Sequence, residues 1–301
     1  MPIIRTPDDR FANLPGFPYE PRYVQVRGVR LHYVDEGAGE TVLCLHGEPT
    51  WSYLYRKMIP PLSGRHRVVA MDFVGFGRSD KYTEREAYTV QMHRDMLQGF
   101  LDALDLTAIT LVCQDWGGLI GLRVAAELPD RFARLVIMNT GLPTGDEPMT
   151  EGFLRWREFA RSQPDLPVGF IMQRTLVDGD KVDPAVIAAY EAPFPDVSYK
   201  AGASQFPLLV PTSLDDPASA AMRNARAVLS EWTKPALVMF SDLDPVTRGG
   251  DRFFRKLIPS ATEQPEIVIQ GASHFLQEDK GEEIAQHILG FIDRTPLGAI
   301  A

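Results

Sequence analysis

The stretch that most constrains the fold is a predicted strand, Ile109–Cys113, followed by a sharp turn and a predicted helix, Leu119–Glu127. Asp115 lies on the turn between two apolar elements of different period. Because strand and helix backbones approach closely at such a turn, the residues two positions to either side must be small, and Cys113 and Gly117 meet that requirement. The pattern is typical of a nucleophile elbow that carries a carboxylate.

A carboxylate nucleophile predicts a particular chemistry. When its oxygen attacks carbon it forms an ester that water must later split, whereas a serine alkoxide performs acyl transfer. The sequence contains no Gly-x-Ser-x-Gly motif, and Ser273 has no such context, so a serine esterase is disfavoured. Asp115 therefore indicates displacement at saturated carbon.

Strand and helix patterns alternate along the chain, which predicts an α/β fold with a mostly parallel, doubly wound sheet. Catalytic groups of such a sheet gather beyond the carboxyl ends of its strands. Besides the elbow, the predicted elements are a hairpin at Val24–Val34, strands at Thr41–Leu45, Val68–Met71, Leu135–Met138, Ala236–Phe240 and Glu266–Ile269, and helices at about Thr50–Leu62, Thr89–Leu104 and Gly281–Asp293.

One long segment, residues 143–212, interrupts this alternation and differs from the rest of the chain in composition. It is rich in proline and aromatic residues and contains short helical patterns at Gly152–Ser162 and Pro184–Tyr190. The prediction is a core formed by residues 1–142 and 213–301, with a helical cap at 143–212 that closes the pocket and excludes water.

The ester needs a base to activate water, and His274 follows the last predicted strand, where such a base belongs. A carboxylate must hold its imidazole. Asp244 is preferred, because a short loop after Ala236–Phe240 reaches toward the histidine, and Asp242 is the alternative. The other usual place for this acid holds Asn139, whose amide cannot supply the charge.

Two backbone N–H groups are expected to stabilise the charge that develops when water attacks the ester. One belongs to Trp116, next to the nucleophile, and the other to Glu48, just beyond an early strand. The Glu48 side chain would repel Asp115, which leaves two interpretations: it positions the water or it is protonated.

Four motifs together resemble the haloalkane dehalogenases, in the subfamily whose catalytic acid follows the strand before the histidine. The similarity covers nearly the whole chain and implies the α/β-hydrolase fold. The motifs are His46-Gly47-Glu48-Pro49-Thr50-Trp51, Gln114-Asp115-Trp116-Gly117-Gly118, Ala192-Pro193-Phe194-Pro195-Asp196 and His274-Phe275-Leu276-Gln277-Glu278-Asp279.

The resemblance implies that Asp115 displaces halide from a haloalkane and that water activated by His274 releases a primary alcohol. It also implies that Trp116 and Trp156 hold the leaving halide. An indole N–H suits this role because it is a donor on an apolar body. Phe153 and Pro207 resemble residues that line the family's pocket, although both also fit ordinary packing of the cap.

Composition limits the partners. The net charge of -9, without a basic cluster, argues against nucleic acid, and no segment reaches transmembrane length. Cys44 and Cys113 fall in apolar strands, which predicts packed thiols and, with no signal peptide, a cytoplasmic protein. The expected partners are a small halogenated hydrocarbon, halide and water, with no metal or cofactor and a monomeric chain.

Three alternatives remain open at this stage. An epoxide hydrolase also uses an elbow aspartate but needs acidic hydroxyls, for which Tyr190 and Tyr199 are available. A fluoroacetate dehalogenase binds its carboxylate through arginines beside the nucleophile, where this chain has Trp116. A binding protein with an inactive site is disfavoured by the intact nucleophile, base and acid.

Overall fold

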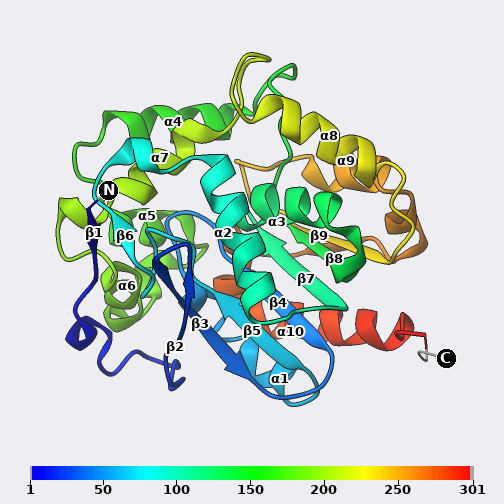
Figure 1. Cartoon of the computed structure of the whole chain (residues 1–301), viewed down its shortest axis with the longest axis horizontal. Coiled ribbons are helices and arrows are strands. Elements are labelled where there is room, and N and C mark those ends of the chain that lie inside the picture. The colour runs from blue at the N-terminus through cyan, green and yellow to red at the C-terminus, as the bar shows by residue number, and fades with distance from the viewer. Residues whose placement is uncertain (1, 299–301) are drawn as a thin grey trace.

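An eight-stranded sheet forms the centre of the structure, a computed structural model that describes residues 2–298 (Figure 1). The strand order is β10-β9-β8-β7-β4-β5-β3-β2, and neighbours run parallel from β10 to β5. β3 and β2 add an antiparallel edge. The strands are β2 (Arg22–Val26), β3 (Val29–Glu36), β4 (Thr41–Leu45), β5 (Arg67–Met71), β7 (Ile109–Gln114), β8 (Phe132–Met138), β9 (Ala236–Ser241) and β10 (Ile267–Ile269), while β1 (Ile3–Ile4) pairs separately with β6 (Lys81–Tyr82).

Both faces of this sheet are covered, which explains the apolar runs in its central strands. Every residue of β4 and β7 is buried. The helices α2 (Val90–Ala103), α3 (Trp116–Glu127) and α8 (Ser219–Leu229) pack side by side on one face, and α1 (Ile59–Ser63) packs with α10 (Leu276–Arg294) on the other (Figure 1). Another helix of the core, α9 (Gly250–Leu257), packs against β9. The predicted α/β class and mostly parallel sheet are confirmed.

The single helix predicted at about Thr50–Leu62 is wrong. A 3-10 turn, Ser52–Tyr55, comes first, and α1 begins only at Ile59. Pro60 and Pro61 occupy the first turn of α1, where a missing N–H is harmless, but a proline further into a helix would clash with the preceding turn. The prolines therefore mark a helix start.

The final helix is longer than predicted. It begins at Leu276, and its backbone departs from helical geometry at Lys280, just before the predicted start at Gly281. Its first turn directly follows His274, so the extra residues bring the end of the helix to the histidine.

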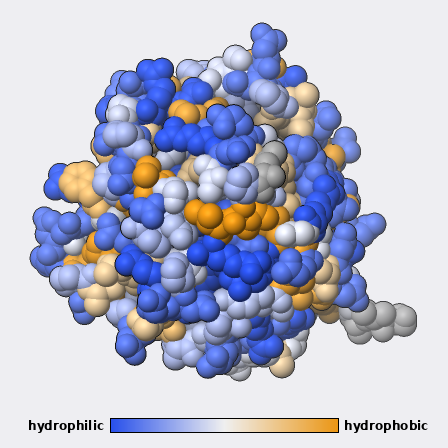
Figure 2. Space-filling model, turned by 60° about the vertical axis from the view of Figure 1, so that its left-hand side comes forward, coloured by the Kyte–Doolittle hydropathy of each residue, from blue (hydrophilic) through white to orange (hydrophobic). Residues whose placement is uncertain are grey.

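Four helices lie between β8 and α8. They are α4 (Glu151–Ser162), α5 (Val168–Thr175), α6 (Pro184–Glu191) and α7 (Ala201–Leu209). α4 packs against α7, and α5 against α6, to one side of the sheet (Figure 1). The surface over this side is mostly polar, with apolar patches between polar regions (Figure 2). Within residues 2–298, no helix combines the length and apolarity that a bilayer crossing requires.

Candidate active site

Asp115 stands on a strained turn between β7 and α3. Its φ of 49° and ψ of -121° lie outside the common regions for a residue with a side chain. A Cβ on Gly117 would lie 2.1 Å from the carbonyl oxygen of Leu45, so only glycine fits there. The turn thus places the Asp115 carboxylate at the carboxyl edge of the sheet and at the start of α3. The first N–H groups of a helix have no partners within the helix.

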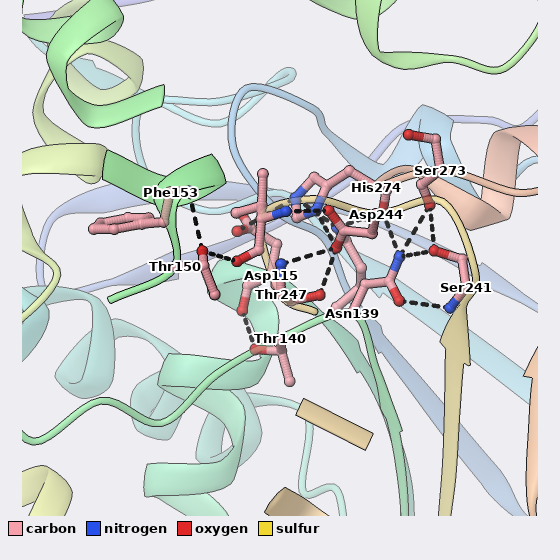
Figure 3. A network of polar contacts seen from close by, with 12 residues as sticks. Asp115, Asn139, Thr140, Thr150, Phe153, Ser241, Asp244, Thr247, Ser273 and His274 are labelled. Atoms are coloured by element: carbon pink, nitrogen blue, oxygen red, sulfur yellow. Dashed lines mark hydrogen bonds and ion pairs between the residues drawn. The ribbon is translucent and has the colours of Figure 1, made fainter. Parts of the chain in front are cut away.

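His274 lies between two carboxylates (Figure 3). Its Nδ1 is 2.9 Å from Asp244 Oδ2, and its Nε2 is 3.5 Å from Asp115 Oδ2. Burial disfavours the charged imidazole, but Asp244 and Asp115 outweigh it and raise the pKa of His274 to about 10. The structure therefore brings together the three residues that were predicted as nucleophile, base and acid.

The two candidate acids after β9 have different partners. Asp244 is buried and also accepts hydrogen bonds from the N–H groups of Val246 and Thr247. Asp242 instead accepts hydrogen bonds from the N–H groups of Gly271 and Ala272, at 2.8 and 3.3 Å. Asp244 is thus the one that faces the imidazole, whereas Asp242 stabilises the turn after β10.

A backbone donor holds the other carboxylate oxygen of Asp115. The Glu48 N–H donates to Asp115 Oδ1 at 2.8 Å. A Cβ on Gly47 would lie 2.5 Å from Asp115, so this approach requires glycine. His46 fixes the turn, because its Nδ1 is 2.9 Å from the Gly47 carbonyl and its Nε2 accepts a hydrogen bond from Phe73 N–H. Trp116, the other predicted donor, is the first residue of α3.

The Glu48 side chain is buried, and neither of its carboxyl oxygens has a hydrogen-bond partner among the described residues. Burial, and then the charge of Asp115, raise the pKa of Glu48 well above its usual value. The raised pKa favours the neutral form of Glu48, and the neutral form avoids the repulsion that a charged carboxylate beside Asp115 would cause.

A cavity of about 640 Å³ opens over this edge of the sheet. Asp115, Trp116 and His274 line it from the core, and α4 and α7 contribute Phe153, Trp156 and Pro207. Both tryptophans that were predicted to hold the halide therefore line the same cavity as Asp115.

The two tyrosines that would serve an epoxide hydrolase lie elsewhere. Tyr190 is fully buried, and its hydroxyl donates to Glu278 at 2.6 Å. Tyr199 is partly buried at the end of a 3-10 turn, and the cavity lining within the described part of the chain includes neither residue. No acidic hydroxyl of theirs therefore faces the nucleophile.

Two amides at the site were missed or misjudged by sequence reasoning. Gln114 Nε2 lies 3.2 Å from His274 Nε2 and donates to the His274 carbonyl at 3.2 Å. Asn139, considered only as a failed acid, donates to the carbonyls of Ser273 and His274 (Figure 3). The signal in the sequence was position: Gln114 is the last residue of β7, and Asn139 directly follows the neighbouring strand β8.

Comparisons with known proteins agree with this arrangement. Residues 40–281 match the family model of the alpha/beta hydrolase fold. A haloalkane dehalogenase of Psychrobacter cryohalolentis is 54% identical, covering 98% of this chain and 100% of its own, and one of Mycobacterium marinum is 50% identical, covering 97% and 100%. The tetrameric structure of haloalkane dehalogenase DpaA from Paraglaciecola agarilytica NO2 has 40% identity and a TM-score of 0.90, and the match covers 96% of this chain and 98% of that one. The resemblance seen in the sequence motifs is confirmed: this chain is a hydrolase that belongs to the haloalkane dehalogenases.

Proposed function

We propose that this chain removes halide from small haloalkanes by way of an alkyl ester on Asp115. The observation that carries the proposal is the position of that carboxylate, which lines one cavity together with Trp116 and Trp156. An elbow aspartate supplies a carboxylate nucleophile, and indole N–H donors on apolar rings suit a halide as it gathers negative charge.

The first step uses the two Asp115 oxygens differently. Oδ1 is held by the Glu48 N–H, whereas Oδ2 lies 3.5 Å from His274 Nε2 and is the attacking oxygen. It forms a bond to the substrate carbon while the carbon–halogen bond breaks and the halide leaves with the bonding electrons. Trp116 and Trp156 hold the departing halide, each indole N–H contributing about 1.5 to 3 kcal/mol.

The second step uses His274 as a base. Esterification removes the negative charge of Asp115, and with it one of the interactions that raise the pKa of His274, so the imidazole becomes able to accept a proton. Water then attacks the Asp115 carbonyl carbon, its proton passes to His274, and Asp244 stabilises the imidazolium. The N–H groups of Glu48 and Trp116 stabilise the oxyanion, and the proton returns to the leaving alkoxide to give the alcohol.

The apolar side chains of the cavity lining support an uncharged substrate, and the lining also includes Glu147, Arg174, Arg226 and Arg248. Phe153, Pro207 and the two tryptophans present apolar surface around the nucleophile, and Trp116 takes a position where a carboxylate-binding site would need arginine. We propose that residues 143–212 form the cap, whose helices α4 and α7 supply that surface.

The test combines three substrates with one variant. Purified protein is mixed with 1,2-dibromoethane, a 1-haloalkane or styrene oxide while halide and diol are measured. Halide release without diol formation supports the proposal, and diol from styrene oxide with no halide release would support an epoxide hydrolase instead. Asp115→Ala should release no halide.

Isotope labelling tests the ester directly. In a single turnover in ¹⁸O water, the alcohol should carry the original Asp115 oxygen and the label should enter the Asp115 side chain. Label in the first alcohol, with none in Asp115, would show direct attack by water and refute the ester.

The assembly and location of the chain are also proposals. The DpaA structure is described as tetrameric, whereas the sequence predicts a monomer, and light scattering of the purified chain will decide between them. Both cysteines are buried and free, which fits the predicted cytoplasmic location. Cell fractionation tests that location.

A further inference from the structure

The turn that carries His274 continues into two acidic residues, Glu278 and Asp279, whose side chains reach away from the cavity. We call residues 273–279 the histidine turn. Glu278 is buried and ion-paired, and Asp279 is partly buried. Neither lines the cavity, so the two-step mechanism above gives them no role.

Glu278 joins the histidine turn to the cap. The Tyr190 hydroxyl, at the end of α6, donates to Glu278 Oε2 at 2.6 Å. The Tyr190 ring packs edge-on against Tyr53 with centroids 5.2 Å apart. Burial opposes ionisation of Glu278, but hydrogen bonds from Arg56 and Tyr190 hold its pKa below the usual value. The carboxylate is therefore charged, and its hydrogen bond to Tyr190 is charge-assisted.

Asp279 provides a second connection to the cap. Its Oδ2 accepts a hydrogen bond from the Ser273 N–H at 2.9 Å, immediately before His274. Its Oδ1 accepts a hydrogen bond from the Val177 N–H, after α5, at 3.3 Å. One carboxylate thus connects the cap to the residue that precedes the base.

The core holds the same turn from the opposite side. Arg56 forms a two-fold ion pair with Glu278, in which Nη2 is 2.7 Å from Oε1, and Lys57 Nζ donates to the Glu278 carbonyl at 2.6 Å. Arg56 and Lys57 follow the segment that carries Glu48, the donor to Asp115. The histidine turn is therefore fixed between the cap and the segment after β4.

We propose that Tyr190 is a positioning residue, which acts with Asp279 to set the place of His274 for the second half of the reaction. The inference rests on the proposed ester mechanism. His274 takes part in ester hydrolysis, whereas halide displacement depends on Asp115 and the tryptophans. Loosening the histidine turn should therefore slow hydrolysis and leave displacement unchanged.

The test is single-turnover kinetics of Tyr190→Phe with 1,2-dibromoethane, in which the halide burst and the decay of alkyl-enzyme are followed separately. This change removes only the hydroxyl and keeps the ring against Tyr53. The halide burst should stay within about twofold of wild type, while ester hydrolysis slows by about 10- to 100-fold, because small displacements of a catalytic group have effects of that size. Alkyl-enzyme should accumulate in mass spectra.

Tyr53→Phe is the matched control. Its hydroxyl belongs to the same aromatic cluster but donates to the Pro15 carbonyl and not to the histidine turn. Both of its steps should match wild type. If Tyr190→Phe folds poorly, Asp279→Asn tests the second connection at a partly exposed position and should show the same selective loss.

Unchanged ester hydrolysis in both variants would overturn the proposal. An equal loss of halide displacement and ester hydrolysis would also overturn it, because such a loss indicates that the whole site is disturbed and not the position of His274 alone. Wild-type protein that releases no halide would instead refute the proposed function. A mass shift on Asp115 in wild type but no accumulation in either variant would preserve the function and reject the positioning role.

Discussion

Replacing Asp244 by Asn tests the acid that we propose for the second step. Asp244 Oδ1 accepts from the Val246 N–H at 2.8 Å, and Oδ2 faces His274 Nδ1 at 2.9 Å. Asn has no negative charge and only one oxygen acceptor, so its NH₂ group must face donors on one side, either the Val246 N–H or His274 Nδ1 together with the Thr247 N–H. Loss of a hydrogen bond between charged groups removes about 1.5 to 3 kcal/mol, so ester hydrolysis should slow by about 10- to 150-fold. Selection of the wrong tautomer by the NH₂ group would slow it further.

The assay is rapid-quench kinetics with 1,2-dibromoethane. The bromide burst should keep its rate and approach one per active site, and alkyl-enzyme should then decay slowly. Asp242→Asn is the matched control, because Asp242 lies two residues away and receives only the backbone N–H groups of Gly271 and Ala272. Normal hydrolysis in Asp244→Asn, or an equal loss in Asp242→Asn, would refute the reasoning.

Three further changes test other parts of the site. Trp156→Phe keeps an aromatic ring near Phe159 but loses the N–H, so bromide should bind about 10- to 150-fold more weakly in a fluorescence titration, and unchanged affinity would assign Trp156 to packing. Gly47→Ala places a methyl group 2.5 Å from Asp115, so the halide burst should disappear while circular dichroism stays native, and a normal burst would contradict this crowding. Because Glu278 has a lowered pKa, its stabilising contribution is complete above its usual pKa of 4.5 and is lost as pH falls through the lower folded value. Urea unfolding between pH 6 and pH 3 should therefore show a steeper loss of stability for wild type than for Glu278→Gln, and equal slopes would argue against the ion pair.

Much of the site could be predicted because its parts are local. A buried strand followed by a turn and a helix specifies the elbow at Asp115, and the step from β4 into His46-Gly47-Glu48 specifies a backbone donor. The order of these units implies a parallel sheet, whose carboxyl ends converge. Gly47 and Gly117 are required at these turns because a Cβ atom would collide with Asp115 at position 47 and with the Leu45 carbonyl at position 117.

Predictions of helix bounds from apolar spacing failed where proline or a break in the backbone changed the start of the helix. The apolar spacing between Thr50 and Leu62 resembles a helix, but Pro60 and Pro61 allow a helix only from Ile59 onward. The start of α10 was missed because the backbone departs from helical geometry at Lys280.

The sequence by itself determined the fold class and the family and identified Asp115 and His274 as the candidate nucleophile and base, because each depends on residues that lie close together along the chain or on the order of the strands. Only the tertiary structure decided that Asp244 and not Asp242 meets His274, and that Tyr190 turns away from the cavity toward Glu278. The reason is physical: His274 and Asp244 are 30 residues apart in the chain, Tyr190 and Glu278 are 88 apart, and only the packing of whole elements brings such pairs together. Asp242 and Asp244 are two residues apart in one loop, and the folded path of that loop decides which of them meets the histidine.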